Sequence, residues 1–315
     1  MQLQHASQVE SLGRTLVALG SEREDIVVLD PDVSASTKTT YFAERFPRRF
    51  IRMGISEQDM IGVAAGLAAS GKTPFACGFA KFVTGRAWEQ IANSIARPKM
   101  NVKIVGTHSG LSGSADGDSH QTVGDIALMR VLPNMNVVVP ADAPSVEEAT
   151  RAIAEEPGPA YMRLVRGASP AVYDGGCTFT LGKANLLREG SDATVIACGV
   201  MVAMAQAVAE DLAAQGVSVR VLDMHTVKPL DVSSVVKAAR ETGAVVTAEE
   251  HSILGGLGGA VAETLVEAYP IPVNRVGILD RFGDSSRSYS ELQEAMGLTP
   301  RAIAGAVMTL MEKRR

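Results

Sequence analysis

A single glutamate opens an apolar, helix-like stretch in the segment Ile51-Arg-Met-Gly-Ile-Ser-Glu-Gln-Asp-Met60. We expect an apolar strand to run into this helix through Gly54, with Ser56 as the N-cap and Asp59 at the capping-box position. Glu57 then lies in the first helical turn, where the helix dipole favours a carboxylate. The same place is the C-terminal end of a parallel strand, where α/β sheets bind ligands. The spacing therefore allows both a structural and a functional role for Glu57.

A glycine-rich loop, Gly106-Thr-His-Ser-Gly-Leu-Ser-Gly-Ser-Ala-Asp-Gly-Asp-Ser-His-Gln121, holds two histidines and two aspartates. A loop of this length without secondary structure is usually functional or disordered. Histidine and aspartate suit the recognition of a polyol or proton transfer near neutral pH. Asp116, Asp118 and His120 match no EF-hand or zinc spacing, so we expect no metal site here.

Three of the eight phenylalanines, Phe75, Phe79 and Phe82, fall within eight positions. Packing at the end of a strand would explain them. The alternative is a stacking wall for a flat heteroaromatic ring.

Three further features carry weaker signals. The segment Gly255-Gly-Leu-Gly-Gly259 opens a helix, and a close-packed helix start explains it better than phosphate binding does. His225 and His251 are compatible with loop or interface positions.

Short apolar runs alternate with amphipathic stretches along the whole chain, which predicts parallel sheets covered by helices. Strands are expected at 25–30, 74–79, 101–106, 136–140, 193–199, 217–224, 244–248 and 272–277. Helices are expected at 8–19, 57–70, 84–96, 123–131, 145–155, 200–214 and 233–240, from near 255, and twice at the C-terminal end. Ser145 is expected to start a capping box. The segment 167–190 breaks the alternation, so the prediction is an α/β protein of two domains.

Composition narrows the class of protein further. The chain has 315 residues, a formal net charge of −5 and 46% hydrophobic residues. Mild acidity argues against nucleic-acid binding as the main task. No apolar run reaches the roughly 18 residues of a membrane span, and the first ten residues lack a secretory signal. Three cysteines without CxxC spacing fit a reduced protein, so we expect a cytoplasmic location.

Together these segments resemble the transketolase family of thiamine-diphosphate enzymes. Gly54-Ile-Ser-Glu57-Gln resembles the family's glutamate motif, and Thr107-His108 through His120-Gln121 resembles its active-site loop. Glu249-Glu-His-Ser-Ile-Leu-Gly-Gly-Leu-Gly258 resembles a helix start in the family's C-terminal domain. The resemblance covers essentially the whole chain, in order. It implies a pyrimidine-binding domain at 1–170, a linker at 171–186 and a transketolase C-terminal domain at 187–315.

The resemblance implies that three residues bind the cofactor. Glu57 would hydrogen-bond the aminopyrimidine ring and promote the imino tautomer, which generates the reactive ylide of the cofactor. Phe79 would stack on the pyrimidine, and Phe82 would form the second ring of that wall.

The resemblance also implies a set of substrate contacts. Asp116 would bind the C2 hydroxyl of the sugar, and His120 would lie near the transferred two-carbon unit, so both join Glu57 as catalytic residues. His108 and Arg166 would bind the phosphate of the substrate, since arginine suits bidentate anion binding. Ser36 matches a further phosphate contact, and the role of the neighbouring Arg163 is open.

Transketolases bind the diphosphate and its divalent metal through a GDG…N motif on a separate N-terminal domain, and this chain shows no such motif. The resemblance therefore implies a partner: an N-terminal transketolase subunit that carries this motif and the Mg²⁺ or Ca²⁺ ion. It implies an α2β2 assembly, inactive without the partner, that transfers a ketol unit between sugar phosphates.

Two departures from the family pattern concern the substrate. The family often has a phosphate-binding arginine in a first-helix pattern like ATREAYG, whereas Ser7-Gln-Val-Glu-Ser-Leu-Gly13 places Val9 there. Either Arg14 substitutes from the next turn, or the anionic group of the acceptor differs. The segment Asp280-Arg-Phe-Gly-Asp-Ser-Ser-Arg287 only partly matches the family's DRFGESG.

Three alternatives compete with a transketolase subunit. A protein like 1-deoxyxylulose-5-phosphate synthase shares the Asp-Gly…His-Gln loop but lacks the Thr-His pair seen at Thr107-His108. A β subunit of a 2-oxo-acid dehydrogenase has the same two-domain size but lacks the pattern of Asp116 and His120. A non-catalytic assembly subunit is the third, and we expect such a chain to have lost Glu57 or His120.

Overall fold

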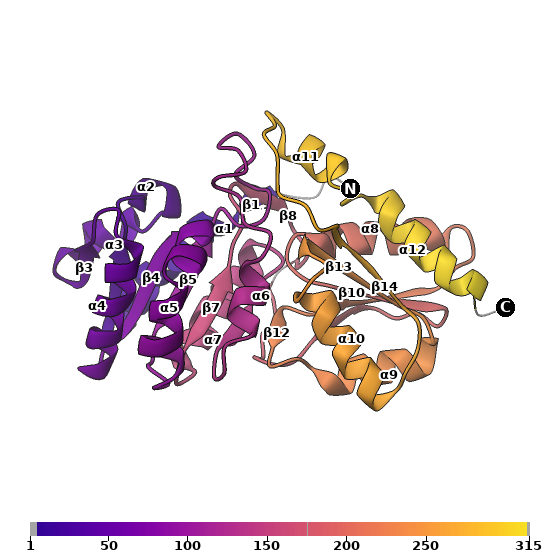
Figure 1. Cartoon of the computed structure of the whole chain (residues 1–315), viewed down its shortest axis with the longest axis horizontal. Helices are drawn as coiled ribbons and strands as arrows, with labels where there is room; N and C mark the ends of the chain where they lie inside the picture. Colours follow the sequence, from indigo (N-terminus) through magenta and orange to yellow (C-terminus); the bar gives the residue numbers. More distant parts are fainter. Residues whose placement is uncertain (1–4, 175, 314–315) are drawn as a thin grey trace.

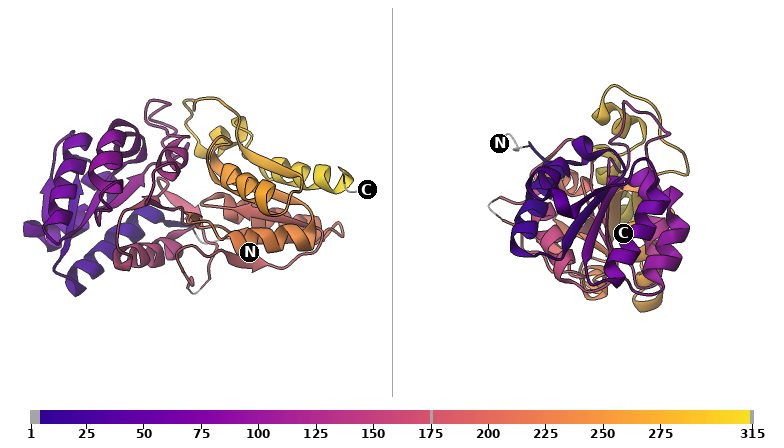
Figure 2. Two further views of the ribbon diagram at one scale, coloured as in Figure 1. Left: turned by 60° about the horizontal axis from the view of Figure 1, so that its bottom comes forward. Right: turned by 90° about the vertical axis from the view of Figure 1, so that its left-hand side faces the viewer.

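The computed structural model describes residues 5–174 and 176–313, which form two α/β lobes that lie side by side (Figure 1). Each lobe holds a mainly parallel sheet with helices on both faces. The predicted fold class is therefore confirmed. The left view of Figure 2 shows the same two halves from a further direction, with the C-terminal half forming the second lobe, and the right view looks along the long axis with the first lobe in front.

The first sheet has seven strands in the order β12-β6-β7-β5-β4-β2-β3. Its strands are β2 (Ile26–Asp30), β3 (Phe50–Arg52), β4 (Thr73–Phe79), β5 (Lys103–Thr107), β6 (Asn136–Val138), β7 (Ala160–Arg163) and β12 (Thr226–Lys228). The central strands are buried on both faces, which explains their nearly continuous apolar runs. Strand β12 comes from the C-terminal half of the chain and pairs antiparallel with β6, so this sheet crosses the junction between the lobes.

The second sheet has five strands in the order β14-β13-β10-β11-β9, and only β9 is antiparallel to its neighbour. Its strands are β9 (Asn185–Arg188), β10 (Ala193–Ala197), β11 (Val219–Asp223), β13 (Val245–Ser252) and β14 (Val273–Ile278). A separate antiparallel pair joins β1 (His5–Ser7) to β8 (Ala168–Pro170). These two strands tie the start of the chain to the segment that leaves the first lobe.

Helices α1 and α7 cover one face of the first sheet and α4 and α6 the other, while α8 and α12 lie opposite α9 and α10 on the second sheet. The α-helices are α1 (Gln8–Glu22), α2 (Ser34–Thr37), α3 (Thr40–Arg45), α4 (Glu57–Ala69), α5 (Trp88–Gln90), α6 (Asp125–Arg130), α7 (Ala143–Glu155), α8 (Met201–Ala213), α9 (Val232–Thr242), α10 (Leu257–Ala268), α11 (Tyr289–Ala295) and α12 (Pro300–Lys313). A 3₁₀ turn, η1 (Pro47–Arg49), and two π-helical segments, η2 (Lys81–Arg86) and η3 (Ile91–Ala96), complete the set. No helix of the described residues is long and apolar enough to cross a membrane.

Two predicted helices differ from the structure. The helix expected at 84–96 is divided into η2, α5 and η3, and the π-helical geometry begins at Lys81, two residues after Phe79 at the end of β4. Such π-helical turns are common at functional sites. The helix expected at 123–131 is shorter, because the Val123 carbonyl accepts a hydrogen bond from the Ser252 N–H of the second lobe (2.7 Å).

Two predicted helix caps differ from the structure: Ser145 does not start the capping box of α7, and Ser56 is the N-cap residue of α4 as expected but makes no capping hydrogen bond. The capping box of α7 starts at Asp142 and not at Ser145, since the Asp142 carboxylate accepts the Ser145 N–H at 3.0 Å. The hydroxyl of Ser56 makes no cap at α4 and donates to the Met53 carbonyl instead, at 2.8 Å. Asp142 is the better choice because its second oxygen accepts the N–H groups of Val172 and Tyr173, 30 and 31 residues away.

A shared apolar core joins the two lobes. One buried cluster includes Val137 and Met135 of the first lobe together with Leu222, Met224 and Val227, which lead from the second sheet into β12. Burial of this surface makes the relative position of the lobes part of the fold.

Replacing Asp142 by alanine should lower the free energy of unfolding by about 2–4 kcal/mol, because a helix cap and two further charge-assisted hydrogen bonds are lost. Urea unfolding followed by circular dichroism measures the change. Asp142→Asn, which keeps an acceptor oxygen, is the matched control and should lose less. Equal stability of Asp142→Ala and the wild-type chain would contradict this role.

Candidate active site

Parallel strands bring the candidate residues to one edge of the first sheet. Phe79 ends β4 and pairs with Thr107, which ends β5. The chain then turns at His108, whose φ of +55° lies in the left-handed region. The segments that follow both strands therefore start side by side, as is typical of ligand sites in α/β sheets.

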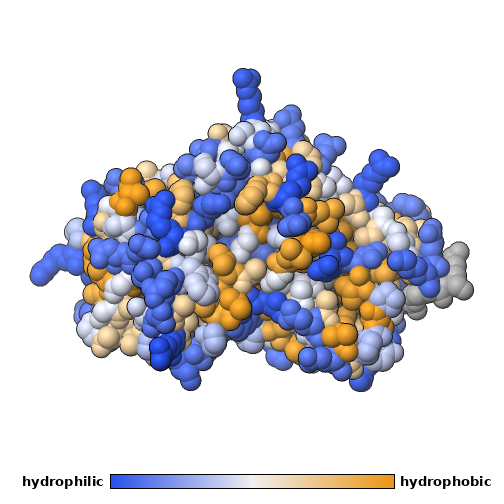
Figure 3. Space-filling model, in the orientation of Figure 1, coloured by the Kyte–Doolittle hydropathy of each residue, from blue (hydrophilic) through white to orange (hydrophobic). Residues whose placement is uncertain are grey.

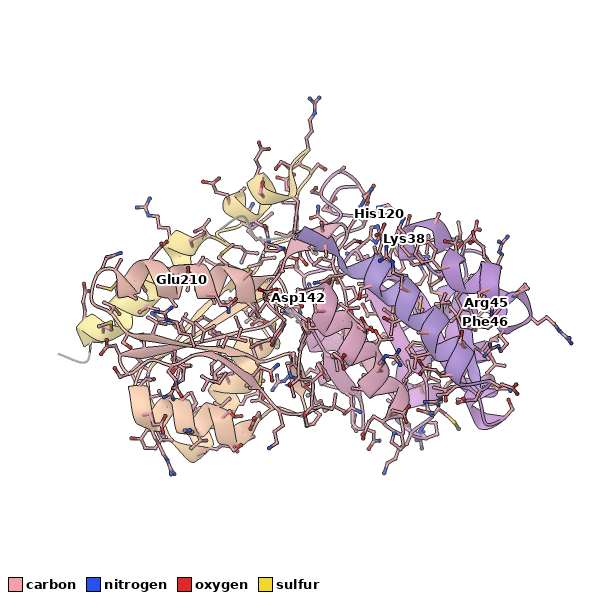
Figure 4. All side chains as sticks on the ribbon, turned by 180° about the vertical axis from the view of Figure 1, so that it is seen from behind. Lys38, Arg45, Phe46, His120, Asp142 and Glu210 are labelled. Carbon is pink, nitrogen blue, oxygen red and sulfur yellow. The ribbon has the colours of Figure 1, made fainter. Side chains whose placement is uncertain are left out.

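Four aromatic side chains, which we call the ring cluster, meet at this edge: Phe79, Phe82, His108 and His120. The ring centroids of Phe79 and His108 are 4.2 Å apart, and those of Phe82 and His120 are 5.3 Å apart in an edge-on arrangement. Phe79 and Phe82 lie 6.4 Å apart. Phe75, in contrast, is fully buried in the core of the first lobe. Figure 4 shows His120 from behind, above the first lobe, and Asp142 at the junction of the lobes.

His108 is held in one tautomer by its neighbours. The Thr107 hydroxyl donates to the Gly78 carbonyl (3.2 Å), so it accepts from the His108 ring Nδ1–H at 3.1 Å. The other ring nitrogen, Nε2, then carries a lone pair. Burial, followed by the nearby Arg166 guanidinium, lowers the pKa of His108 to about 4. His108 is therefore neutral at pH 7 in the free chain.

Arg166 and Asp116 form an ion pair, with Arg166 Nη1 donating to Asp116 Oδ2 at 2.8 Å. Both side chains are partly exposed, at 49% and 37%, so the pair contributes little to stability. The expected anion-binding and hydroxyl-binding residues thus neutralise each other in this structure. Among the described residues, no group of three or more His, Cys, Asp or Glu side chains could hold a metal ion.

Glu57 is the first residue of α4, and only 3% of it is exposed. Arg86 Nη1 donates to Glu57 Oε2 at 2.7 Å, and the Arg86 guanidinium lies 4.6 Å from the centre of the Phe82 ring. Arg86 thereby connects the buried carboxylate to the ring cluster. Arg86 is not among the predicted site residues, because the expected helix at 84–96 excludes Phe82; in the observed segment η2 the two residues are four positions apart.

A cavity of about 470 Å³ lies beside this pair, lined among others by Phe82, Arg86, Gln121, Leu128 and Phe282. The residues come from η2, the glycine-rich loop, α6 and the segment after β14. Figure 3 shows apolar surface in the middle of the face seen in Figure 1, between the two lobes. Phe282 is 80% exposed, so an apolar side chain stands open to solvent at the mouth of the cavity.

A buried polar network supports the glycine-rich loop from below. Arg163 donates to the Asp125 carboxylate (2.8 Å) and to the Glu250 backbone carbonyl (2.9 Å). The Glu250 side chain accepts from Tyr289 and Gln293 of α11, and burial raises its pKa. Glu250 of the second lobe and Arg163 both lie against Gly110 of the loop that holds the two histidines. The network therefore supports this loop.

The second lobe also touches the loop from above. Ser286 N–H donates to the Ser114 carbonyl (3.1 Å), and the Gln121 side chain donates to the Asp284 carbonyl (2.7 Å). Figure 1 shows this yellow segment beside the magenta loop. The segment 280–287, which differs from the family pattern, thus lies directly on the glycine-rich loop.

Three positions make no hydrogen bond, ion pair or ring contact with the ring cluster among the described residues. Ser36 is exposed on α2, and no hydrogen bond of its side chain is found among the described residues. Val9 is buried. Arg14 pairs with Glu10 and lines a different cavity, between α1 and α7. Arg14 therefore does not replace the arginine that is missing at Val9.

The weaker signals have structural explanations. The Glu249 carboxylate accepts the N–H groups of Leu257 (2.7 Å) and Gly258 (2.8 Å), so the start of α10 is occupied by a carboxylate and not open to phosphate. His251 is fully buried and accepts the Ala127 N–H at Nε2. His225 is buried against the Phe179 ring.

Comparison with known proteins identifies the family of the chain. Residues 5–171 match the family described as transketolase, pyrimidine binding domain, and residues 182–303 match transketolase, C-terminal domain. The chain is 45% identical over 304 residues to a putative transketolase C-terminal section of Methanocaldococcus jannaschii, covering 96% of this chain and 95% of that protein. It is 42% identical over 299 residues to a 6-deoxy-6-sulfo-D-fructose transketolase subunit of a Clostridium strain, covering 95% and 92%.

A solved structure, described as a split gene transketolase in an inactive beta4 tetramer, is 50% identical and superposes with a TM-score of 0.91 over 99% of this chain and 100% of that one. The chain therefore belongs to the transketolase family. Within that family it corresponds to the C-terminal section, which consists of the pyrimidine-binding and C-terminal domains.

In the free chain, His108 should stay neutral until the pH falls to about 4. Because its ordinary pKa is 6.5, the unfolded chain takes up a proton first, and His108 lowers the stability of the fold as the pH drops from 6.5 towards 4. Nitrogen-15 NMR of the histidine rings measures the titration, and His108→Asn assigns the signal. A His108 signal that titrates near 6.5 would contradict the buried, neutral ring.

Gly110 has a φ of +58°, and an added Cβ would overlap Glu250 Oε2. Gly110→Ala should cost more than the roughly 1–2 kcal/mol of a left-handed backbone alone, since the Glu250 side chain must also move. Chemical unfolding measures the loss. Gly305→Ala in α12, where a Cβ meets open space, is the control and should stabilise the chain slightly. Similar effects of the two substitutions would contradict the tight contact.

Proposed function

We propose that this chain is the C-terminal subunit of a thiamine-diphosphate-dependent transketolase, which transfers a two-carbon ketol unit between sugar phosphates together with an N-terminal partner subunit. One observation carries the proposal. A buried carboxylate, Glu57, is connected through Arg86 to a cluster of four aromatic rings at the carboxyl edge of a parallel sheet. A carboxylate beside an aromatic wall suits an aminopyrimidine, which combines a flat ring with a basic nitrogen.

The residues present fit the pyrimidine end of the cofactor. Phe79 and Phe82 offer ring surface, and Oε1 of Glu57 has no hydrogen-bond partner among the described side chains. When bound, the cofactor supplies the carbanion chemistry, and the protein orients it and controls its protons. Glu57 would hold a proton at the ring nitrogen. We assign the diphosphate and its Mg²⁺ or Ca²⁺ ion to the partner subunit, on the family resemblance.

The substrate contacts follow from the same edge of the sheet. His120 would lie beside the transferred two-carbon unit, and Asp116 would accept a hydrogen bond from a sugar hydroxyl. Arg166 would bind the anionic group of the substrate, with His108 beside it and Ser36 as a more distant contact. Because Arg166 is paired with Asp116 in the free chain, substrate binding would have to exchange that pair for contacts to the sugar.

The identity of the sugar is the open part of the proposal. With Val9 buried and Arg14 on another surface, the family's extra arginine has no replacement in α1. The Clostridium relative is named for a sulfonated sugar. We therefore propose a sugar whose anionic group is bound mainly by Arg166, and a phosphate is one form of it.

The proposal includes an assembly and a location. We propose an α2β2 complex in the cytoplasm, with the pyrimidine-binding domain at 1–170, a linker at 171–186 and the C-terminal domain at 187–315. The related structure that is described as an inactive tetramer of beta chains supports a need for the partner.

Glu57→Gln should reduce turnover by the complex with the partner subunit at least about 100-fold, the lower range for loss of an acid–base group, while assembly is unchanged. The complex is captured through a tag on this chain, and ketol transfer is followed with a set of phosphorylated and sulfonated sugars. Glu44→Gln, at an exposed position of α3, is the matched control.

Near-normal turnover by Glu57→Gln would contradict the proposed role of this residue. Consumption of pyruvate in place of ketol transfer would instead favour a synthase-like or dehydrogenase-like enzyme. A complex that binds thiamine diphosphate but converts no sugar would favour an assembly subunit.

A further inference from the structure

The carboxylate of Glu57 needs a partner because it is removed from water. Its side chain is 4% exposed, and burial of an unpaired charge is strongly unfavourable. Arg86 is its hydrogen-bond partner among the described side chains, with Nη1 donating to Oε2 at 2.7 Å.

Arg86 is itself held in place by the two elements that form the site. Its guanidinium stacks on Phe82, 4.6 Å from the ring centre. The Gln58 side chain, one residue after Glu57, donates to the Arg86 carbonyl at 3.1 Å. The π-helical turn that ends at Arg86 is thus attached to the start of α4 by its backbone and by its side chain.

The ion pair uses one carboxylate oxygen and leaves the other available. Oε2 accepts from Arg86, whereas no hydrogen bond to Oε1 occurs within the described part of the chain. A planar guanidinium fixes the direction of the carboxylate it binds better than a flexible ammonium group does. The position of Arg86 therefore sets where Oε1 points.

We propose that Arg86 is a positioning residue that clamps Oε2 of Glu57, so that Oε1 is presented to the ring nitrogen of the cofactor. This inference rests on the proposed function and deepens it. Arg86 touches the carboxylate and the Phe82 ring, so it acts through groups that would contact the cofactor. Its positive charge also offsets the charge of the buried Glu57 carboxylate.

The test is exchange of the C2 proton of thiamine diphosphate for deuterium, followed by NMR in the native complex with the partner subunit. This readout reports activation of the cofactor without a sugar substrate. Arg86→Gln should slow the exchange at least about tenfold, the scale for groups that orient a ligand. Arg86→Lys should recover part of the rate, since it restores the charge but not the planar fork.

Two further variants separate positioning from general damage. Arg97→Gln, at an exposed position just after η3, should exchange at the wild-type rate. In a Glu57→Gln background, Arg86→Gln should cause no further loss, because the group it positions is absent. Melting temperatures of all variants check that each complex is folded.

An Arg86→Gln complex that is folded and exchanges at the wild-type rate would overturn the proposal. So would full additivity with Glu57→Gln. Faster exchange in Arg86→Gln would overturn it in a different way, by indicating that Arg86 blocks Glu57. If the wild-type complex itself fails to accelerate exchange, the proposed function fails, and this inference fails with it.

Discussion

The buried Arg163 guanidinium is the contact on which the arrangement of the two lobes and the site depends. Arg163 is the last residue of β7 in the first lobe. Its guanidinium donates to Asp125 at the start of α6 and to the Glu250 backbone carbonyl in β13 of the second lobe. Burial alone would lower the pKa of Arg163, but the Asp125 and Glu250 carboxylates keep it raised, so the charge is permanent. Loss of the Asp125 carboxylate would leave this buried charge without its hydrogen-bonded counter-ion. The buried Arg163 charge therefore connects the two lobes beneath the glycine-rich loop.

Buried and exposed ion pairs have different roles in this chain. The Arg163–Asp125 pair is buried on both sides, and in the Arg86–Glu57 pair the carboxylate is buried while the guanidinium is half-exposed; both pairs connect elements that are distant in the sequence. The pair of Arg166 and Asp116 is partly exposed, so solvent and salt weaken it and a ligand can replace it at little cost. Under the proposed function, the Glu57 pair would lie on the cofactor side of the site and the exchangeable Arg166–Asp116 pair on the substrate side.

Local patterns in the sequence predicted the two sheets and the loop between β5 and α6, whereas a shared site for the aromatic and histidine residues was implied only by the family resemblance. They failed where a distant group decides the geometry. Asp142 replaced Ser145 as the cap of α7 because its carboxylate also binds Val172 and Tyr173. The Glu249 carboxylate binds the first N–H groups of α10. The Glu250 carboxylate of the second lobe packs tightly against Gly110 of the first lobe. Arg86 was missed because its partner Glu57 is 29 residues away.

The central claim is that this chain forms one half of a cofactor site and a partner subunit forms the other. The most direct test is to isolate the tagged chain from its own cells and to measure the native mass and the thiamine diphosphate content of the complex. The account predicts that the complex contains a second, different chain and about one bound thiamine diphosphate for each pair of unlike chains. An assembly of this chain alone that is active in ketol transfer, or a complex with a second chain that binds no thiamine diphosphate, would contradict it.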